Sequence, residues 1–134
     1  MIRFLHHIAI IVSAETGVEF YKALGFIEEN RIDRGYDQLV WLNGYGEKIE
    51  VFIDSTHPSR STNPEALGLR HLAFEVDDVN VEWDRLCRYN PEPIRVKDNG
   101  KKVFFVKDYA RSIKGTTQVK SSSINAFRHF SKVA

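Results

Sequence analysis

Two short segments of the chain each carry a histidine within an apolar run, and the two runs are alike. The segments are Leu5–Val12 and Leu69–Val76, offset by 64 residues, with Leu, His, Ala and Val at the same four places. Their matching histidines are His7 and His71. A repeat of this kind predicts that one half of the molecule copies the other. Two histidines at equivalent places could then act in one site.

Glu50 is the third side chain whose type and position suit the same chemistry. Successive side chains of a β-strand point to opposite faces. Glu50 therefore lies opposite Ile49 and Val51 in its apolar run, as His7 and His71 lie opposite the aliphatic residues of theirs. If the aliphatic residues pack on helices, all three polar side chains face the other way.

Two imidazoles and one carboxylate suit a divalent metal such as Zn, Ni, Co, Mn or Fe(II). Three protein ligands leave coordination positions for water or substrate, which a catalytic metal needs. A lone histidine in a strand more often has a structural hydrogen bond. The residue pattern alone therefore leaves a metal site and a structural role both open.

The apolar patterns read strand, helix, strand, strand, strand, and this order occurs twice. Helical spacing begins after Ser13, a predicted N-cap, and again after Asp77 or Asp78. In the first half the predicted strands are Phe4–Val12, Phe26–Ile32, Gln38–Leu42 and Lys48–Ile53. In the second half they are Leu69–Val76, Pro93–Val96, Lys102–Val106 and a last strand near 111–119.

Composition narrows the class of protein. With 134 residues, 43% hydrophobic and 28% charged, the chain is typical of a soluble globular protein. Its net charge of +1 gives no general attraction to nucleic acid or anionic membranes. The single cysteine, Cys87, excludes an internal disulfide and is expected to be a buried thiol. No apolar run is long enough to span a membrane and no signal peptide is recognisable, so we expect a cytoplasmic protein.

The motifs resemble signatures of the vicinal-oxygen-chelate superfamily, which includes glyoxalase I, extradiol dioxygenases, and fosfomycin and bleomycin resistance proteins. The matching segments are His7–Val12, Ile49–Phe52 and Gly68–Asp77. Pro64–His71 is similar to a small bacterial glyoxalase-like subgroup. The resemblance covers roughly residues 3–108. It implies that the protein is a homodimer that binds a small-molecule substrate.

The resemblance also implies a ligand set and an architecture. His7, Glu50 and His71 match the family's metal ligands, whereas His6 lies on the opposite strand face and is not implied. We predict an α+β fold, one domain over residues 1–134, in which two βαβββ modules form a cupped mixed sheet. Residues 1–54 are the first module, 55–68 a linker, 69–120 the second module with an atypical last strand, and 121–134 a basic tail.

The end of the chain departs from the family pattern. Members typically close with a Pro-Asp-Gly turn and a strand bearing a further Glu, but Asp108 is the last acidic residue here. The 64-residue offset puts Lys114 at the counterpart of Glu50, and the family's usual turn puts Gly115 there. Three interpretations stay open. The metal has three protein ligands, or Gln118 or His129 supplies a fourth, or the tail no longer encodes the last strand and catalysis is impaired.

The resemblance favours a metal-dependent lyase or isomerase of the glyoxalase type, acting on a small molecule with neighbouring oxygens. The metal would act as a Lewis acid and stabilise an enediolate, while Glu50 moves a proton between adjacent carbons. Arg70, Phe52 and His57 are predicted substrate contacts. A non-haem Fe(II) ring-cleaving dioxygenase is the alternative enzyme, because two histidines and a carboxylate suit that chemistry. A non-catalytic protein that binds a small molecule such as an antibiotic is the alternative outside enzymes.

Overall fold

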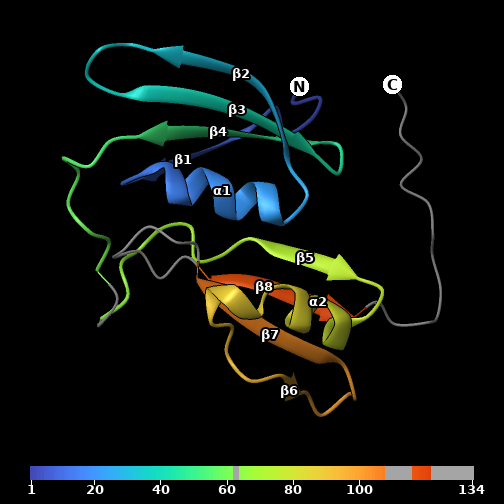
Figure 1. Cartoon of the computed structure of the whole chain (residues 1–134). Helices are drawn as coiled ribbons and strands as arrows, with labels where there is room; N and C mark the ends of the chain where they lie inside the picture. The colour runs from blue at the N-terminus through green and yellow to red at the C-terminus, as the bar shows by residue number, and fades with distance from the viewer. Residues whose placement is uncertain (62–63, 108–115, 122–134) are drawn as a thin grey trace. The chain divides into compact units, whose positions relative to one another are not determined.

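The computed structural model describes residues 1–61, 64–107 and 116–121 of the chain (Figure 1). It is an α+β structure with two compact units, one built on residues 1–70 and the other on residues 71–106 with the last strand. Each unit repeats the predicted order of strand, helix and three strands. Whether the sheets of the two units form one cupped sheet depends on how the units sit together, so this part of the architecture stays a prediction.

The first unit is a mixed sheet with one helix. Its strand order is β1-β4-β3-β2, in which β1 runs parallel to β4 and the other neighbouring strands are antiparallel. The elements are β1 Ile8–Val12, α1 Glu15–Ala23, β2 Ile27–Asp33, β3 Gln38–Gly44 and β4 Glu47–Ile53. The parallel pairing places the histidine-bearing strand beside the strand that carries Glu50, although about 40 residues separate them in the sequence.

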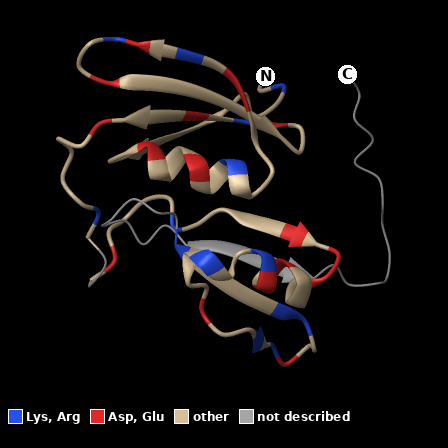
Figure 2. Cartoon of the chain, in the orientation of Figure 1, with Lys and Arg blue, Asp and Glu red and all other residues tan. Residues whose placement is uncertain are grey.

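Helix α1 covers one face of this sheet (Figure 1). Its buried side includes Val18 and Phe20, and the facing strands bury their aliphatic residues completely or nearly so. These strand residues are Val12, Val40, Leu42, Ile49 and Val51. An acidic residue, Glu15, lies in the first turn of α1 and a basic one, Lys22, in its last turn, which suits the helix dipole (Figure 2). The core therefore fixes which face of each strand is left for the polar residues.

Gly17 allows α1 to lie close against β1. A Cβ at residue 17 would lie 2.6 Å from the Cβ of Val12, which cannot rotate away. Gly17→Ala is therefore expected to destabilise the fold by ~1–3 kcal/mol through overpacking, more than the ~1 kcal/mol that alanine gains in helix propensity. Urea unfolding measures this difference. Glu19→Ala on the exposed side of α1 is the control, and equal stability of the two variants would contradict the close approach.

Arg31 of β2 ties α1 to the sheet. Its guanidinium donates to both carboxylate oxygens of Glu15, at 2.8 and 2.7 Å, and to Glu28 at 2.7 Å. These hydrogen bonds from Arg31 hold the pKa of Glu15 and that of Glu28 below the usual range. A carboxyl group with a lowered folded-state pKa stabilises the fold above its unfolded pKa. That contribution is lost as the pH falls through the folded-state pKa.

The free energy of unfolding is accordingly expected to drop in acid, by about 0.5–1 kcal/mol from this cluster. The value is small because the Glu15 side chain is 48% exposed. Arg31→Gln should remove this part of the pH dependence below about pH 4.5, as urea unfolding at a series of pH values would show. Arg95→Gln, which removes a more exposed pair with Glu92, is the matched control. Parallel pH curves for wild type and Arg31→Gln would contradict the assignment.

The second unit repeats the topology of the first. Its strand order is β5-β8-β7-β6, and β5 runs parallel to β8 as β1 runs parallel to β4. The elements are β5 Ala73–Val76, α2 Val79–Arg85, the 3-10 helix η1 Cys87–Tyr89, β6 Arg95–Val96, β7 Lys102–Lys107 and β8 Thr116–Ser121. The side chain of Asp78 caps α2 by accepting from the amides of Asn80 and Val81, as predicted. Among the described residues, no helix is long and apolar enough to cross a membrane.

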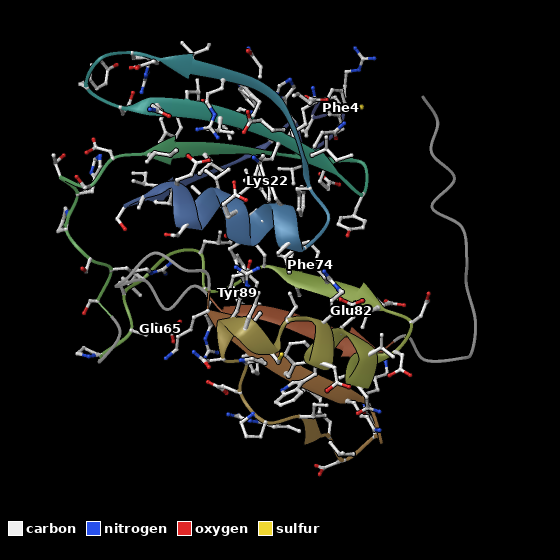
Figure 3. The ribbon with its side chains drawn as sticks, in the orientation of Figure 1. Phe4, Lys22, Glu65, Phe74, Glu82 and Tyr89 are labelled. Carbon is white, nitrogen blue, oxygen red and sulfur yellow. The ribbon has the colours of Figure 1, made fainter. Side chains whose placement is uncertain are left out.

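Several predicted boundaries were wrong. Strand β1 starts at Ile8 rather than Phe4, and Phe4 is exposed near the N-terminus (Figure 3). Strand β5 starts at Ala73 rather than Leu69. The first paired residues are Ile8 and Ala73, so His7 and His71 precede the ladders, although the partner strands begin earlier, at Glu47 and Thr116.

Two further local predictions were wrong. The N-cap of α1 is Ala14 rather than Ser13, and its side chain makes no capping hydrogen bond. Cys87 is exposed, because α2 ends at Arg85 and the chain turns into η1 before the apolar stripe reaches that residue. The predicted tail from residue 122 onward lies outside the described residues.

Candidate metal centre

His7 and Glu50 meet across the β1–β4 pair on the face that α1 leaves free. Glu50 lies between Ile49 and Val51, whose side chains are buried on the helix side. The register pairs Glu50 with Ala9 of β1, two residues beyond His7. His7 Nε2 lies 3.0 Å from Glu50 Oε2, and the Glu50 side chain is 14% exposed. The predicted pair therefore exists within the first unit.

Two neighbouring side chains hold the His7 ring. His6 Nδ1 lies 2.8 Å from His7 Nδ1, a hydrogen bond in which one ring donates and the other accepts. The ring of Trp41 stands edge-on to His7, with centroids 5.1 Å apart. Trp41 is directly opposite Glu50 in the β3–β4 register. The imidazole is thus fixed with Nε2 toward the carboxylate and Nδ1 toward His6.

This geometry fits a divalent ion. Two ligand atoms about 2.1 Å from one ion and at right angles to each other are about 3.0 Å apart, which matches the His7–Glu50 separation. Histidines that bind a metal usually donate their second N–H to a neighbouring acceptor. His6 Nδ1 can accept that bond when His7 presents the Nε2 lone pair. Strand alternation predicts His6 on the opposite face from His7. Both histidines precede β1, however, and the ring of His6 contacts that of His7.

His71 belongs to the second unit and has a matching environment there. Its ring stands edge-on to Phe105, with centroids 6.0 Å apart. Phe105 follows Trp41 by 64 residues, the same offset that relates the two histidines. Within the described part of the chain, no three His, Cys, Asp or Glu side chains gather as a metal-binding group. The common site for His7, Glu50 and His71 stays a prediction.

The strand register identifies the counterpart of Glu50 in the second unit. Glu50 pairs with Ala9 on the parallel neighbour, and Gln118 of β8 pairs in the same way with Ala73. Ala73 follows Ala9 by 64 residues, but Gln118 follows Glu50 by 68. The connection before β8 is thus four residues longer, which a constant offset misses. Lys114 and Gly115, predicted for this place, lie outside the described residues, as does His129.

Strand β8 contradicts the interpretation that the tail no longer encodes a last strand. The chain does encode a last strand, Thr116–Ser121, which pairs with β5 in the expected orientation. The predicted range of 111–119 was too early for the same reason, the longer connection. What differs from the family pattern is the residue type at the register position, an amide rather than a carboxylate.

The predicted substrate contacts have other partners in the structure. Arg70 pairs at 3.3 Å with Glu65, which is labelled in Figure 3. His57 lies 3.3 Å from Asp54, whose pKa is lowered chiefly by the Thr56 hydroxyl and amide. Phe52 shares the face of Glu50 and lies beneath the guanidinium of Arg34. Phe52 is related to the His7–Glu50 pair by its position, two residues after Glu50 on β4 and therefore on the same strand face.

Comparison with known protein families places the chain in a superfamily. The sequence pattern of the Glyoxalase/Bleomycin resistance protein/Dioxygenase superfamily matches residues 4–110, and the chain belongs to this superfamily. It is 41% identical over 117 residues to the uncharacterized protein YwkD of Bacillus subtilis strain 168. The match covers 81% of this chain and 91% of YwkD.

Solved structures agree with this assignment. The glyoxalase family protein from Enterococcus faecalis is 31% identical, with a TM-score of 0.77, over 88% of this chain and 97% of that one. A mutant of the fosfomycin resistance protein FosX from Listeria monocytogenes has a TM-score of 0.71 at 16% identity, over 92% of this chain and 95% of that one. That FosX structure contains Mn(II) and 1S,2S-dihydroxypropylphosphonic acid. At this identity the likeness shows the fold.

Proposed function

We propose that the protein is a divalent-metal-dependent enzyme of the glyoxalase type, a lyase or isomerase of a small molecule with neighbouring oxygens. The observation that carries this proposal is the His7–Glu50 pair, with its ligand atoms 3.0 Å apart on the free face of the sheet. Membership of the superfamily supports it. His71, at the equivalent place in the second unit, completes the proposed ligand set.

The proposed ion is one of Zn, Ni, Co, Mn or Fe(II), since imidazole and carboxylate suit all of them. The Mn(II) in the FosX structure makes manganese the first ion to test. The bound ion supplies Lewis-acid polarisation of the substrate's neighbouring oxygens. His7, Glu50 and His71 hold it, and His6 orients the ring of His7.

Glu50 is also the proposed catalytic base. A carboxylate that uses one oxygen as a ligand keeps a second oxygen that can accept a proton. A proton taken from one substrate carbon and returned to its neighbour gives the isomerase or lyase outcome. The Glu50 side chain is 14% exposed, so most of it is shielded from bulk water.

Gln118 occupies the register position at which a further carboxylate would complete four protein ligands. Gln118→Glu replaces a neutral amide by a charged oxygen donor at that position. We expect it to tighten Mn(II) binding on the order of tenfold, the lower end of typical effects around a metal. Calorimetric titration of Mn(II) measures the change. Asn99→Asp, in the Asp98–Gly100 turn, adds the same charge elsewhere, and an equal gain there would contradict a local effect.

Deuterium exchange tests the proposed reaction. The Mn(II)-loaded protein, in D2O, is given the hemithioacetal of a 2-oxoaldehyde and a small thiol. The expected product is the 2-hydroxyacyl thioester with solvent deuterium at C2, and Glu50→Gln should not form it. Oxygen uptake with a catechol and Fe(II) would instead support the dioxygenase. If the protein bound the hemithioacetal with undiminished affinity in the presence of a metal chelator and formed no product, the result would support a non-catalytic binding protein and overturn the proposal.

The proposal includes a cytoplasmic homodimer. Strands β1 and β2 form the edges of the first sheet, and unpaired edges are commonly covered by another chain. Sedimentation velocity at micromolar concentration tests this part, and a monomer would contradict it without affecting the proposed metal ligands of the single chain.

A further inference from the structure

Arg34 lies in the turn that joins β2, which ends at Asp33, to β3, which begins at Gln38. Figure 1 shows this turn at one end of the first sheet. The Arg34 amide donates to the Asp37 carbonyl at 3.0 Å, which closes the turn. Nε of Arg34 donates to Asp37 Oδ1 at 2.6 Å, and Nη2 donates to the other carboxylate oxygen. The Asp37 side chain is only 7% exposed. A two-pronged bond to a buried carboxylate fixes the plane of the guanidinium.

Two aromatic rings also contact this guanidinium. Its Cζ atom lies 4.8 Å from the ring centroid of Tyr36 and 5.2 Å from that of Phe52. Phe52 follows Glu50 by two residues on β4, so the two side chains share a face. Arg34 therefore reaches over the face that carries the candidate metal ligands.

One edge of the Arg34 guanidinium is left for another partner. Asp37 occupies the Nε–Nη2 edge, and among the described residues no hydrogen bond to Nη1 is formed. The side chain is 34% exposed. Hydrogen bonds to Asp37, with the charge of Glu50 as a further contribution, raise the pKa of Arg34 and keep it charged. A free guanidinium edge of this kind binds a carboxylate or phosphoryl group through two parallel hydrogen bonds.

We infer that the Nη1–Nη2 edge of Arg34 binds an anionic group of the substrate, while the substrate's neighbouring oxygens bind to the metal ion held by His7 and Glu50. This inference rests on the proposed function. Glu50 and Phe52 are two strand residues apart, about 6.8 Å. The substrate is accordingly a small acid whose carboxylate or phosphoryl group lies a few bonds from the chelating oxygens. Arg34 is thus a specificity-determining residue for that anion.

Paired probes test this inference on the Mn(II)-loaded protein. 2-Hydroxyglutarate and 2-hydroxypentanoate share the 2-hydroxycarboxylate head, but only the first has a terminal carboxylate. 2-Hydroxy-4-phosphonobutanoate carries a phosphonate there, so the set distinguishes the two kinds of anion. Calorimetry is expected to show at least tenfold tighter binding of one or both anionic probes, from charge-assisted hydrogen bonds. Arg34→Gln should reduce this preference to less than twofold.

Two further variants separate recognition from stability. Arg34→Gln with Asp37→Asn avoids leaving a buried carboxylate without its partner and should lose the preference equally. Arg31→Gln is the matched control, because Arg31 is already engaged by Glu15, Glu28 and Gln38, and it should keep the preference. A wild-type protein without preference for either anionic probe, or an unchanged preference in both Arg34 variants, overturns the inference.

The proposed metal site and the anion site at Arg34 can be tested separately. If the chain takes up no Mn(II), the proposed metal site is contradicted, and anion binding at Arg34 can still be measured on the metal-free protein. Succinate and inorganic phosphate should then shift the NMR signal of Arg34 Nε–H and leave that of Arg31 unchanged. No shift with either probe overturns the inference for Arg34 as well.

Discussion

Replacing Glu50 by glutamine is expected to weaken Mn(II) binding by about 100-fold or more. Loss of a mere supporting contact around a metal already costs ~10–100-fold, and Glu50 is proposed as a direct ligand. The change also removes the only charged oxygen within reach of His7 Nε2 in the described first unit, 3.0 Å away. Shape and size of the side chain are nearly preserved, so the fold should persist. Calorimetric titration of Mn(II) into each protein gives the two dissociation constants.

Glu47→Gln is the matched control for this loss. Glu47 begins the same strand, β4, but its side chain is exposed. It should bind Mn(II) like the wild type. If Glu50→Gln retained wild-type affinity, or both variants lost it equally, Glu50 would not be a ligand and the catalytic role given to it would fall as well.

Phe20→Ala is expected to lower the free energy of unfolding by ~3–5 kcal/mol, the usual cost of emptying a buried phenylalanine site. Phe20 is fully buried, on the side of α1 that meets the sheet. The same packing sets the aliphatic face of β4 toward the helix and leaves Glu50 on the other face. Urea denaturation followed by circular dichroism gives the difference.

Phe4→Ala removes the same side chain where it is 66% exposed. Its stability should stay within about 0.5 kcal/mol of wild type. A loss for Phe20→Ala no larger than that for Phe4→Ala would mean that α1 does not form the core of the first unit. The face assignment of β4 would then have no support.

Much of the fold followed from local signals in the sequence. The alternation of Ile49, Glu50 and Val51 predicted both a strand and the faces of its side chains, and burial confirms it. The duplicated His-bearing runs predicted a second copy of the strand order, which the two sheets show. Strand starts were less predictable, because the apolar pattern continues beyond the residues that pair: Phe4 and Leu5 are apolar, yet they are exposed and precede β1.

The site was less predictable, because it depends on register and on residues outside the motifs. Gln118 became the counterpart of Glu50 only when pairing with Ala73 was known, since four additional residues precede β8. Strand alternation extended back to Phe4 places His6 on the opposite face from His7, but β1 starts only at Ile8, so alternation does not apply to His6. Trp41 belongs to no motif, yet it contacts His7. Its relation to Phe105 at the 64-residue offset was a signal that the sequence already contained.

Arg34 had no motif to mark it. The position of its guanidinium depends on the turn closed with Asp37 and on two aromatic rings. One ring, Tyr36, lies in the same turn, and the other, Phe52, lies on β4. Such an arrangement brings together residues up to 18 positions apart and follows from the β2–β3–β4 register. Sequence spacing alone could not distinguish it from Arg31, whose guanidinium is used within the fold.

Pulsed EPR of Mn(II) bound to protein labelled with ¹⁵N-histidine tests most directly whether one ion is shared by both units. With His7 and His71 as ligands, the spectrum should show two directly coordinated imidazole nitrogens, and His71→Ala should leave one. A wild-type spectrum with a single coordinated imidazole, or one that His71→Ala does not change, would contradict the shared metal centre.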